Sequence, residues 1–410
     1  MAVDTNRSCP PVPIWIELSK AQEQVERDNN NHPPLTSGSS DTDYTIITAA
    51  SSIRTSLSLR DKREIIQQYE QRPEKTPDIA SEMEKWYAMT DRYGFLNTQQ
   101  TESDSILLKE KEIERAEKWA AMSHRILIDG ETAYTFSYSS KLRRRVYKGI
   151  PDCWRRDVWY YLVTDGLRSA KEDYAYKKSY QELLLKESPH ERQIDLDIPR
   201  TLRDHIMFKQ RYGSGQRALF NVLRAFSNYD EEVGYCQGMT NIVATILMYC
   251  DEERAFLMLR RMFLRDKLHD LYIPGFPTLM ESFFIQDNLL KRYRSKLYHH
   301  LNELGLSSDI YATRWYITLF TGGVVQYHTL LRIWDIYFLC GYDIFFFVVI
   351  ALLKEYEGRL LSSDLDQCME TLGSAMSVSD DDVFIKNVQR LYERRSQVVK
   401  TLRKAYQESH

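Results

Sequence analysis

Apolar side chains recur every three or four residues through most of the 410-residue chain. Three segments show this spacing most clearly, and each predicts a helix with one buried face. Their apolar positions are Trp154, Val158, Tyr161 and Leu162; Leu219, Val222, Leu223 and Phe226; and Met239, Ile242, Val243, Ile246 and Leu247. Between about residues 147 and 361 no sustained two-residue alternation occurs, and no Asn-Gly or Asp-Gly pair joins two alternating runs. The pattern therefore predicts an all-α domain.

The same pattern divides the chain into four parts. Residues 1–80 are rich in proline and polar residues, so we expect a mostly disordered tail with short helices such as Asp61 to Tyr69. Within this tail, Pro10 to Pro13 is either a polyproline ligand or simply proline-rich chain. Residues 81–146 predict a helical lead-in, with Trp119, Met122 and Ile126 on one amphipathic helix. Residues 147–361 form the main domain, and 362–410 form a C-terminal helical extension.

One apolar run, from Ile336 to Leu353, is barely long enough to span a bilayer. Asp343 interrupts this run, and Gly341 divides it. We therefore favour a buried pair of helices broken at Gly341 over a membrane span.

The C-terminal extension predicts an amphipathic helix whose N-cap is Ser379-Asp380. Its apolar stripe consists of Ile385, Val388, Leu391, Tyr392, Val398 and Leu402, and its basic residues are Arg390, Arg394, Arg395, Lys400, Arg403 and Lys404. Such a helix can lie on anionic lipid. The alternative, which we favour, is that it packs on its own domain and leaves its charges in solvent.

Composition narrows the class of function. The net charge of −3 lacks the basic excess typical of a nucleic-acid binder. The six cysteines are scattered and never spaced Cys-x-x-Cys, so neither a zinc site nor a disulfide framework is expected. His299 and His300 point to different helix faces and are not expected to share a metal. With no apolar signal core at Met1 to Arg7, we expect a cytoplasmic protein, with membrane contact as a peripheral possibility.

Arg200 is the first candidate for chemistry. Pro199 disfavours helical geometry at Ile198, and Thr201-Leu-Arg-Asp204 has the form of a loose capping box. We therefore expect an extended approach, a helix starting at Thr201, and Arg200 projecting from the turn. A guanidinium presents a planar donor fork to phosphate oxygens. The alternative is an ordinary surface arginine near a helix start.

Gln237 is the second candidate, because Gly234 and Gly238 permit a tight turn that places its amide at a helix start. The alternative is a buried structural glutamine. Asp197 is expected to hold a nearby arginine, with Arg155 as the candidate, or else to be a solvated loop carboxylate. A fixed positive charge and a water-aligning amide are two groups that help a GTPase hydrolyse its nucleotide. The chain contains no phosphate-binding loop, so the nucleotide would be carried by a partner.

Several short motifs, taken in order, resemble the TBC domain family of GTPase-activating proteins for Rab GTPases. The first three motifs are similar to Gly149-Ile150-Pro151 with Arg155 and Trp159, Ile194-x-x-Asp197-x-x-Arg200, and Tyr235-x-Gln237. Later helical segments of the family resemble Arg314-Trp315, Phe320 and Arg332 to Asp335, and one branch carries an upstream segment similar to Asp91 to Phe95. Each motif is short, but their order and gaps agree from about residue 147 to 361.

This resemblance implies an all-helical, two-lobed fold. It also implies that Arg200 is an arginine finger and that Gln237 is a glutamine finger replacing the GTPase's own water-orienting glutamine. Arg155, Trp159 and Asp197 match supporting positions, and Tyr235 would pack beneath the glutamine turn. The partner would be a Rab GTPase in its GTP-bound state, which carries the GTP and Mg²⁺, so no cofactor or metal of the chain's own is expected.

Two other functions stay open at this stage. One is a non-catalytic scaffold of the same fold that binds a small GTPase or another partner, against which the presence of both finger residues argues. The other is a membrane-surface adaptor acting through the basic C-terminal helix. Because residues 1–80 carry none of the three motifs, we expect them to be dispensable for the chemistry.

Overall fold

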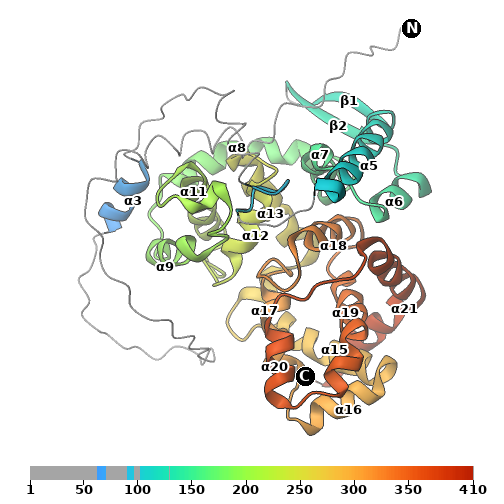
Figure 1. The fold of residues 1–410 in the computed structure, drawn as a ribbon. Coiled ribbons are helices and arrows are strands. Elements are labelled where there is room, and N and C mark those ends of the chain that lie inside the picture. Colours follow the sequence, from blue (N-terminus) through green and yellow to red (C-terminus); the bar gives the residue numbers. More distant parts are fainter. Residues whose placement is uncertain (1–61, 71–89, 97–101, 129, 410) are drawn as a thin grey trace.

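The computed structural model describes residues 62–70, 90–96, 102–128 and 130–409, and its helices form two lobes (Figure 1). The first lobe contains α8 (Ala170–Leu184), α9 (Glu191–Asp197), the short 3-10 helix η1 (Ile198–Arg200), α10 (Ile206–Lys209), α11 (Ser214–Tyr229), α12 (Met239–Leu247) and α13 (Glu252–Asp266). The second contains α15 (Pro277–Tyr293), α16 (Ser295–Glu303), α17 (Ser308–Ile317), α19 (Ile344–Leu361), α20 (Leu365–Gly373) and α21 (Asp381–Ser409). The short helix α14 (His269–Tyr272) leads from one to the other.

Helix α11 is the centre of the first lobe, where it packs against α8, α9, α12 and α13. Its predicted apolar face is buried, as are the predicted faces of α12 and of α7 (Asp152–Val163). Between α11 and α13, the rings of Phe226 and Phe263 lie 4.5 Å apart. The three helices expected from apolar spacing are therefore confirmed.

The apolar run in the second lobe is a broken pair of helices, as predicted. Helix α18 (Tyr327–Cys340) ends at Gly341, whose φ of +81° favours glycine, and α19 begins at Ile344. The first ten residues of α19, 344–353, are buried within the lobe. Among the described residues, no helix combines the length and apolar character needed to cross a membrane.

The two lobes are joined through α18, which packs on α7 and on α6 (Ser140–Tyr147). Aromatic rings fill this junction. The ring of Trp159 lies 5.7 Å from that of Trp334 and stacks on Phe338 at 5.1 Å. Both tryptophans are fully buried. The first sequence motif therefore lies at the joint between the lobes.

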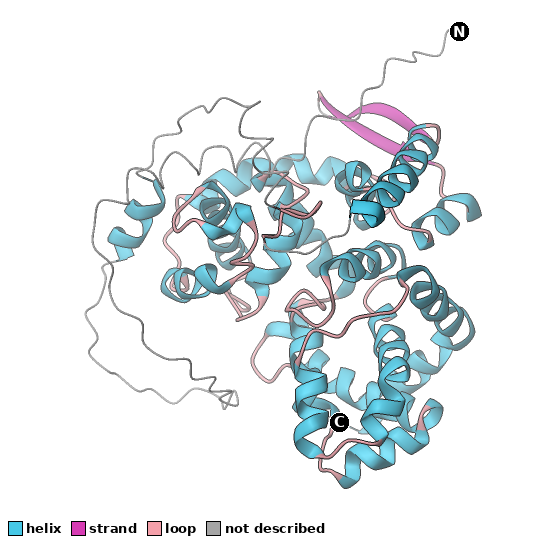
Figure 2. Cartoon of the chain, in the orientation of Figure 1, coloured by secondary structure: helices cyan, strands magenta, loops and turns pink. Residues whose placement is uncertain are grey.

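The expectation of a continuous amphipathic helix through Ile126 is wrong. Helix α5 (Glu102–Ala120) ends after Trp119, and Ile126 lies in β1 (Ser123–Ile128), which pairs antiparallel with β2 (Glu131–Phe136) (Figure 2). A local signal existed, because Asp129-Gly130 stands between two short runs of strand-forming residues. The hairpin packs on α7, where Phe136 accepts a hydrogen bond from the Tyr161 hydroxyl. The domain as a whole is still dominated by helices.

The short helix expected near Asp61 to Tyr69 is confirmed as α3 (Lys62–Glu70). The other predictions for the N-terminal tail, including the polyproline segment, concern residues 1–61 and 71–89, which lie outside the described residues.

Helix α21 packs on its own domain, as favoured, through contacts with α15, α18 and α19. Asp380 caps its start by accepting hydrogen bonds from the backbone N–H groups of Asp382 and Val383. Phe384, Ile385, Val388 and Val399 are its buried residues. Arg403 is anchored by Asp343, at 2.6 Å, and Glu281, at 3.0 Å. The apolar stripe thus faces the second lobe.

Candidate functional site

The first motif is organised by one buried carboxylate, that of Asp335 on α18. It accepts bonds from Arg155 Nε at 3.1 Å, Trp159 Nε1 at 2.9 Å and the Ile150 backbone N–H at 2.9 Å. Burial raises the pKa of Asp335, and the adjacent Arg155 opposes that rise. An unpaired charge at this depth would be costly, so the arrangement stabilises the joint only while every partner is present.

The predicted pairing of Arg155 with Asp197 is wrong. The guanidinium of Arg155 is committed to Asp335 and to Asp152, which lies one turn earlier on α7. Asp335 follows Arg155 by 180 residues, so local spacing could not reveal this partner.

Removing either junction tryptophan should destabilise the protein. We expect Trp159→Ala and Trp334→Ala each to cost about 3–5 kcal/mol, because each deletes a fully buried indole and leaves a cavity. Trp159→Ala also removes a donor from Asp335. Urea unfolding measures the loss, with the exposed Tyr138→Ala as control. Normal stability of Trp159→Ala combined with lost activity would instead assign this residue a direct functional role.

Arg200 ends η1, and the local structure around it differs from the prediction. Ile198 is helical, with φ −55° and ψ −49°, because its N–H continues the α9 hydrogen bonding to the Ile194 carbonyl. Thr201 is extended, and the next helix, α10, starts at Ile206 rather than at Thr201. Pro199 is tolerated because a first turn needs no proline N–H. The side chain of Arg200 is 58% exposed and projects from the end of this short helix.

Asp197 joins the second and third motifs. Its side chain is buried, so the alternative of a solvated carboxylate is wrong. One carboxylate oxygen accepts a hydrogen bond from Arg200, and the other accepts one from the Tyr235 hydroxyl. Burial is the main cause that raises the pKa of Tyr235, and the hydrogen bond and charge of Asp197 raise it further. The phenol therefore keeps its proton and stays a donor. A single carboxylate thus ties Arg200 to the loop that carries Gln237.

Gln237 is the exposed residue of a tight, largely buried turn just before α12, so the alternative of a buried glutamine is wrong. Gly238 has a φ of +104°, and a Cβ there would lie 3.1 Å from Thr318 Cγ2 at the end of α17. A Cβ on Gly234 would lie only 2.1 Å from His190 Nε2. The turn is therefore held between the two lobes, and the positive φ angles of Gly234 (+56°) and Gly238 (+104°) favour glycine at both positions.

Taken together, these contacts leave the side chains of Arg200 and Gln237 exposed, on two segments that Asp197 and Tyr235 connect. Arg200 offers a cationic fork and Gln237 offers an amide. The hydrogen bonds of Asp197 with Arg200 and Tyr235 connect the segment that carries Arg200 to the loop that carries Gln237. Among the described residues, no cluster of His, Cys, Asp and Glu with the geometry of a metal site occurs. The arrangement can stabilise charge and orient a water on a partner's bound nucleotide.

Sequence reasoning did not assign a role to His205, which organises the loop after Arg200. The upstream segment Asp91 to Phe95 lies against it: Nε2 of His205 is 2.8 Å from the Tyr93 carbonyl, and Phe95 and His205 form a β-bridge. A Cβ on Gly94 would lie 2.6 Å from the same ring nitrogen. The glycine in that upstream segment was a signal for this close approach.

His205 predicts a pH dependence of stability. Burial lowers its pKa from 6.5 to about 4, so its ring is neutral in the fold, with Nδ1 accepting the Met207 N–H at 3.2 Å. The unfolded chain therefore binds an extra proton between these values, and stability falls as pH drops from about 6.5 towards 4, by on the order of 3 kcal/mol. Urea midpoints at pH 7 and 5 should differ less in His205→Asn, which keeps an N-cap acceptor, than in wild type. Equal differences would contradict this assignment.

Comparisons with known proteins agree with this architecture. Residues 152–361 match the model of the Rab-GTPase-TBC domain. TBC domain-containing protein C1778.09 of Schizosaccharomyces pombe is 35% identical over 290 residues, which cover 69% of this chain and 68% of that relative. Rab GTPase-activating protein tbc-11 of Caenorhabditis elegans is 34% identical over 226 residues, covering 55% of this chain but 24% of the relative.

Solved structures show the same fold. The Chlamydomonas flagellar RabGAP TBC domain matches with a TM-score of 0.58 and 25% identity, over 73% of this chain and 98% of that one. The Ypt/Rab-GAP domain of Gyp1p matches with a TM-score of 0.57 and 21% identity, over 68% and 99% of the two chains. With the family model spanning residues 152–361 and a relative 35% identical over 69% of this chain, the chain belongs to the Rab-GTPase-TBC domain family.

Proposed function

We propose that this protein accelerates GTP hydrolysis on a Rab-family small GTPase and so regulates vesicle traffic. It inserts Arg200 and Gln237 into the nucleotide site of the GTP-bound partner, where Arg200 stabilises charge on the transferring phosphoryl group and Gln237 orients the attacking water. The GTP and Mg²⁺ belong to the partner. An arginine supplied in trans contributes about 10³- to 10⁵-fold in rate in such systems.

The observation that carries this proposal is the coupling through Asp197. Two exposed side chains of the required chemistry project from separate loops, and one buried carboxylate bonds to Arg200 and to Tyr235, two residues before Gln237. These two hydrogen bonds to Asp197 connect the segments that carry Arg200 and Gln237, as expected for two side chains that act on the same nucleotide. The named relatives include a Rab GTPase-activating protein, which supports the same assignment.

A hydrolysis screen tests the proposal. Full-length protein at catalytic concentration is added to a panel of GTP-loaded Rab proteins, and phosphate release is followed over time. Acceleration of at least one of them, lost in Arg200→Ala, is the expected result. Binding to a GTP-loaded Rab without any acceleration would favour the alternative function, a non-catalytic scaffold.

We also propose a cytoplasmic location with peripheral membrane contact through α21. Its packed face leaves Lys386, Arg390, Arg394, Lys400 and Lys404 exposed. Exposed lysine and arginine side chains attract anionic lipid headgroups. Sedimentation with phosphatidylserine vesicles, compared with neutral vesicles, tests this contact. Equal sedimentation with both would remove the electrostatic basis of the proposal.

A further inference from the structure

Helix α3 comes from the part of the chain before the domain, yet it packs against α9, the helix that leads to Arg200. Ile65 and Tyr69 are buried at 3% and 4% exposure. The ring of Tyr69 stacks on Phe220 of α11, with centroids 4.2 Å apart and an interplanar angle of 11°. It also meets Tyr212 edge to face at 4.9 Å. One aromatic side chain thus inserts between the helices that support the site.

The hydroxyl of Tyr69 makes the contact with α9 specific. It donates to Asp195 Oδ1 at 2.8 Å and accepts from Arg211 Nη1 at 3.1 Å. Arg211 Nη2 in turn lies 2.5 Å from the same Asp195 oxygen. Asp195 is buried, so each of these partners replaces a lost water contact. Burial, together with the charge of Asp195, raises the pKa of Tyr69 and keeps it a donor.

Helix α9 is therefore held by three carboxylates along its seven residues. Glu191 at its start accepts a hydrogen bond from Ser188 N–H and pairs with Arg224 at 2.9 Å, and Asp197 at its end bonds to Arg200 and Tyr235. Asp195, between them, is the one that bonds to α3, through Tyr69, as well as to Arg211. A helix of only two turns has little stability of its own, so its position is set by these contacts.

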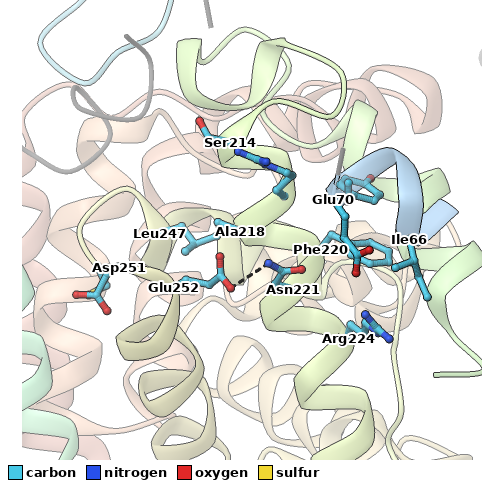
Figure 3. A pocket seen from close by; sticks show the side chains of 13 residues that line it. Ile66, Glu70, Ser214, Ala218, Phe220, Asn221, Arg224, Leu247, Asp251 and Glu252 are labelled. Atoms are coloured by element: carbon cyan, nitrogen blue, oxygen red, sulfur yellow. Dashed lines mark hydrogen bonds between the residues drawn. The ribbon is translucent and has the colours of Figure 1, made fainter. Parts of the chain in front are cut away.

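A cavity beside the contact leaves α3 only partly packed. It has a volume of about 440 Å³ and lies among Ile66 and Glu70 of α3, Asn221 and Arg224 of α11, and Glu252 of α13 (Figure 3). Asn221 donates to Glu252 across its floor at 3.0 Å. Of residues 65–70, whose burial is described, Ile65 and Tyr69 are the buried ones, so the Tyr69 contacts supply much of what holds this part of α3 in place.

We propose that α3 is a brace for the arginine finger, and that Tyr69 and Asp195 are positioning residues that fix α9 and hence Arg200. This inference rests on the proposed function, because it assigns the brace to the same site. It departs from the expectation that all of residues 1–80 are dispensable, since it requires residues 62–70. A finger held by a looser α9 still reaches the partner but is misplaced in the transition state, so kcat falls and KM changes little.

Point variants in the full chain test the brace. Tyr69→Ala removes both the stack and the hydroxyl, Tyr69→Phe removes the hydroxyl alone, and Gln68→Ala is a matched control on an exposed position of α3. We expect kcat to fall about tenfold in Tyr69→Ala, the scale for a hydrogen bond to a charged group, and less in Tyr69→Phe. KM should stay within about twofold, and Gln68→Ala should match wild type. Unchanged kcat in Tyr69→Ala, or a drop matched by a similar rise in KM, would overturn the proposal.

Hydrogen exchange gives a second readout that needs no GTPase. In Tyr69→Ala we expect the backbone N–H groups of residues 194–198, 200 and 201 to exchange about tenfold faster, while those of α12 stay as in wild type. Unchanged exchange at 194–201 would overturn the brace whatever the kinetics. If Arg200→Ala keeps full activity, the proposed catalytic role of Arg200 is wrong. The hydrogen-exchange result still decides whether α3 positions α9.

Discussion

Arg200→Lys is expected to lose nearly all GTPase activation, by about 10³- to 10⁵-fold in kcat/KM, without a loss of stability. Lysine keeps the positive charge and can keep a contact with Asp197. It lacks the planar fork that binds two phosphate oxygens at once. Because the Arg200 side chain is 58% exposed, the fold should depend little on it. The defect should therefore be in the chemistry alone.

The measurement is phosphate release at several concentrations of GTP-loaded Rab, with thermal midpoints recorded in parallel. Arg203→Lys is the matched control, since Arg203 is an exposed arginine three residues further along the same loop. It should retain activity within about twofold, as expected for a substitution away from the reacting centre. Activity of Arg200→Lys equal to that of wild type would remove Arg200 from the mechanism.

Gln237→Ala is expected to lower kcat by about 10²-fold and to change KM little. That is the scale for losing one positioned polar group at a reacting centre. The amide is proposed to act in the transition state, so its loss should not weaken binding of the ground state. Gly234 and Gly238 set the backbone of the turn, and the substitution leaves both unchanged.

Two controls make this result specific. Glu231→Ala changes an exposed residue earlier in the same loop and should leave kcat unaltered. A Rab variant that lacks its own water-orienting glutamine should remain responsive to the wild-type protein. If that Rab variant stops responding while Gln237→Ala stays active, the partner's glutamine aligns the water, and Gln237 does not.

Local pattern was enough to predict the helical class. Apolar spacing located the buried faces of α7, α11 and α12, and Gly341 marked the break between α18 and α19. These features depend on side chains three or four residues apart and on a single backbone angle, which a sequence displays directly. The hairpin after Trp119 is also predictable from the sequence, because Asp129-Gly130 is a turn signal between its two strands. The prediction of a helix through Ile126 overlooks this signal.

The partners of charged and aromatic groups were decided by tertiary structure. Arg155 pairs with Asp335 on α18, so Asp197 is left to Arg200 and Tyr235. Tyr69 reaches Asp195 across 126 residues of sequence. The pairs of Arg155 with Asp335, Tyr235 with Asp197 and Tyr69 with Asp195 join segments far apart in the sequence, and which carboxylate meets which donor there follows from the packing of those segments. Sequence spacing identifies groups that can interact, whereas the cost of burying an unpaired charge selects among them only once the chain is folded.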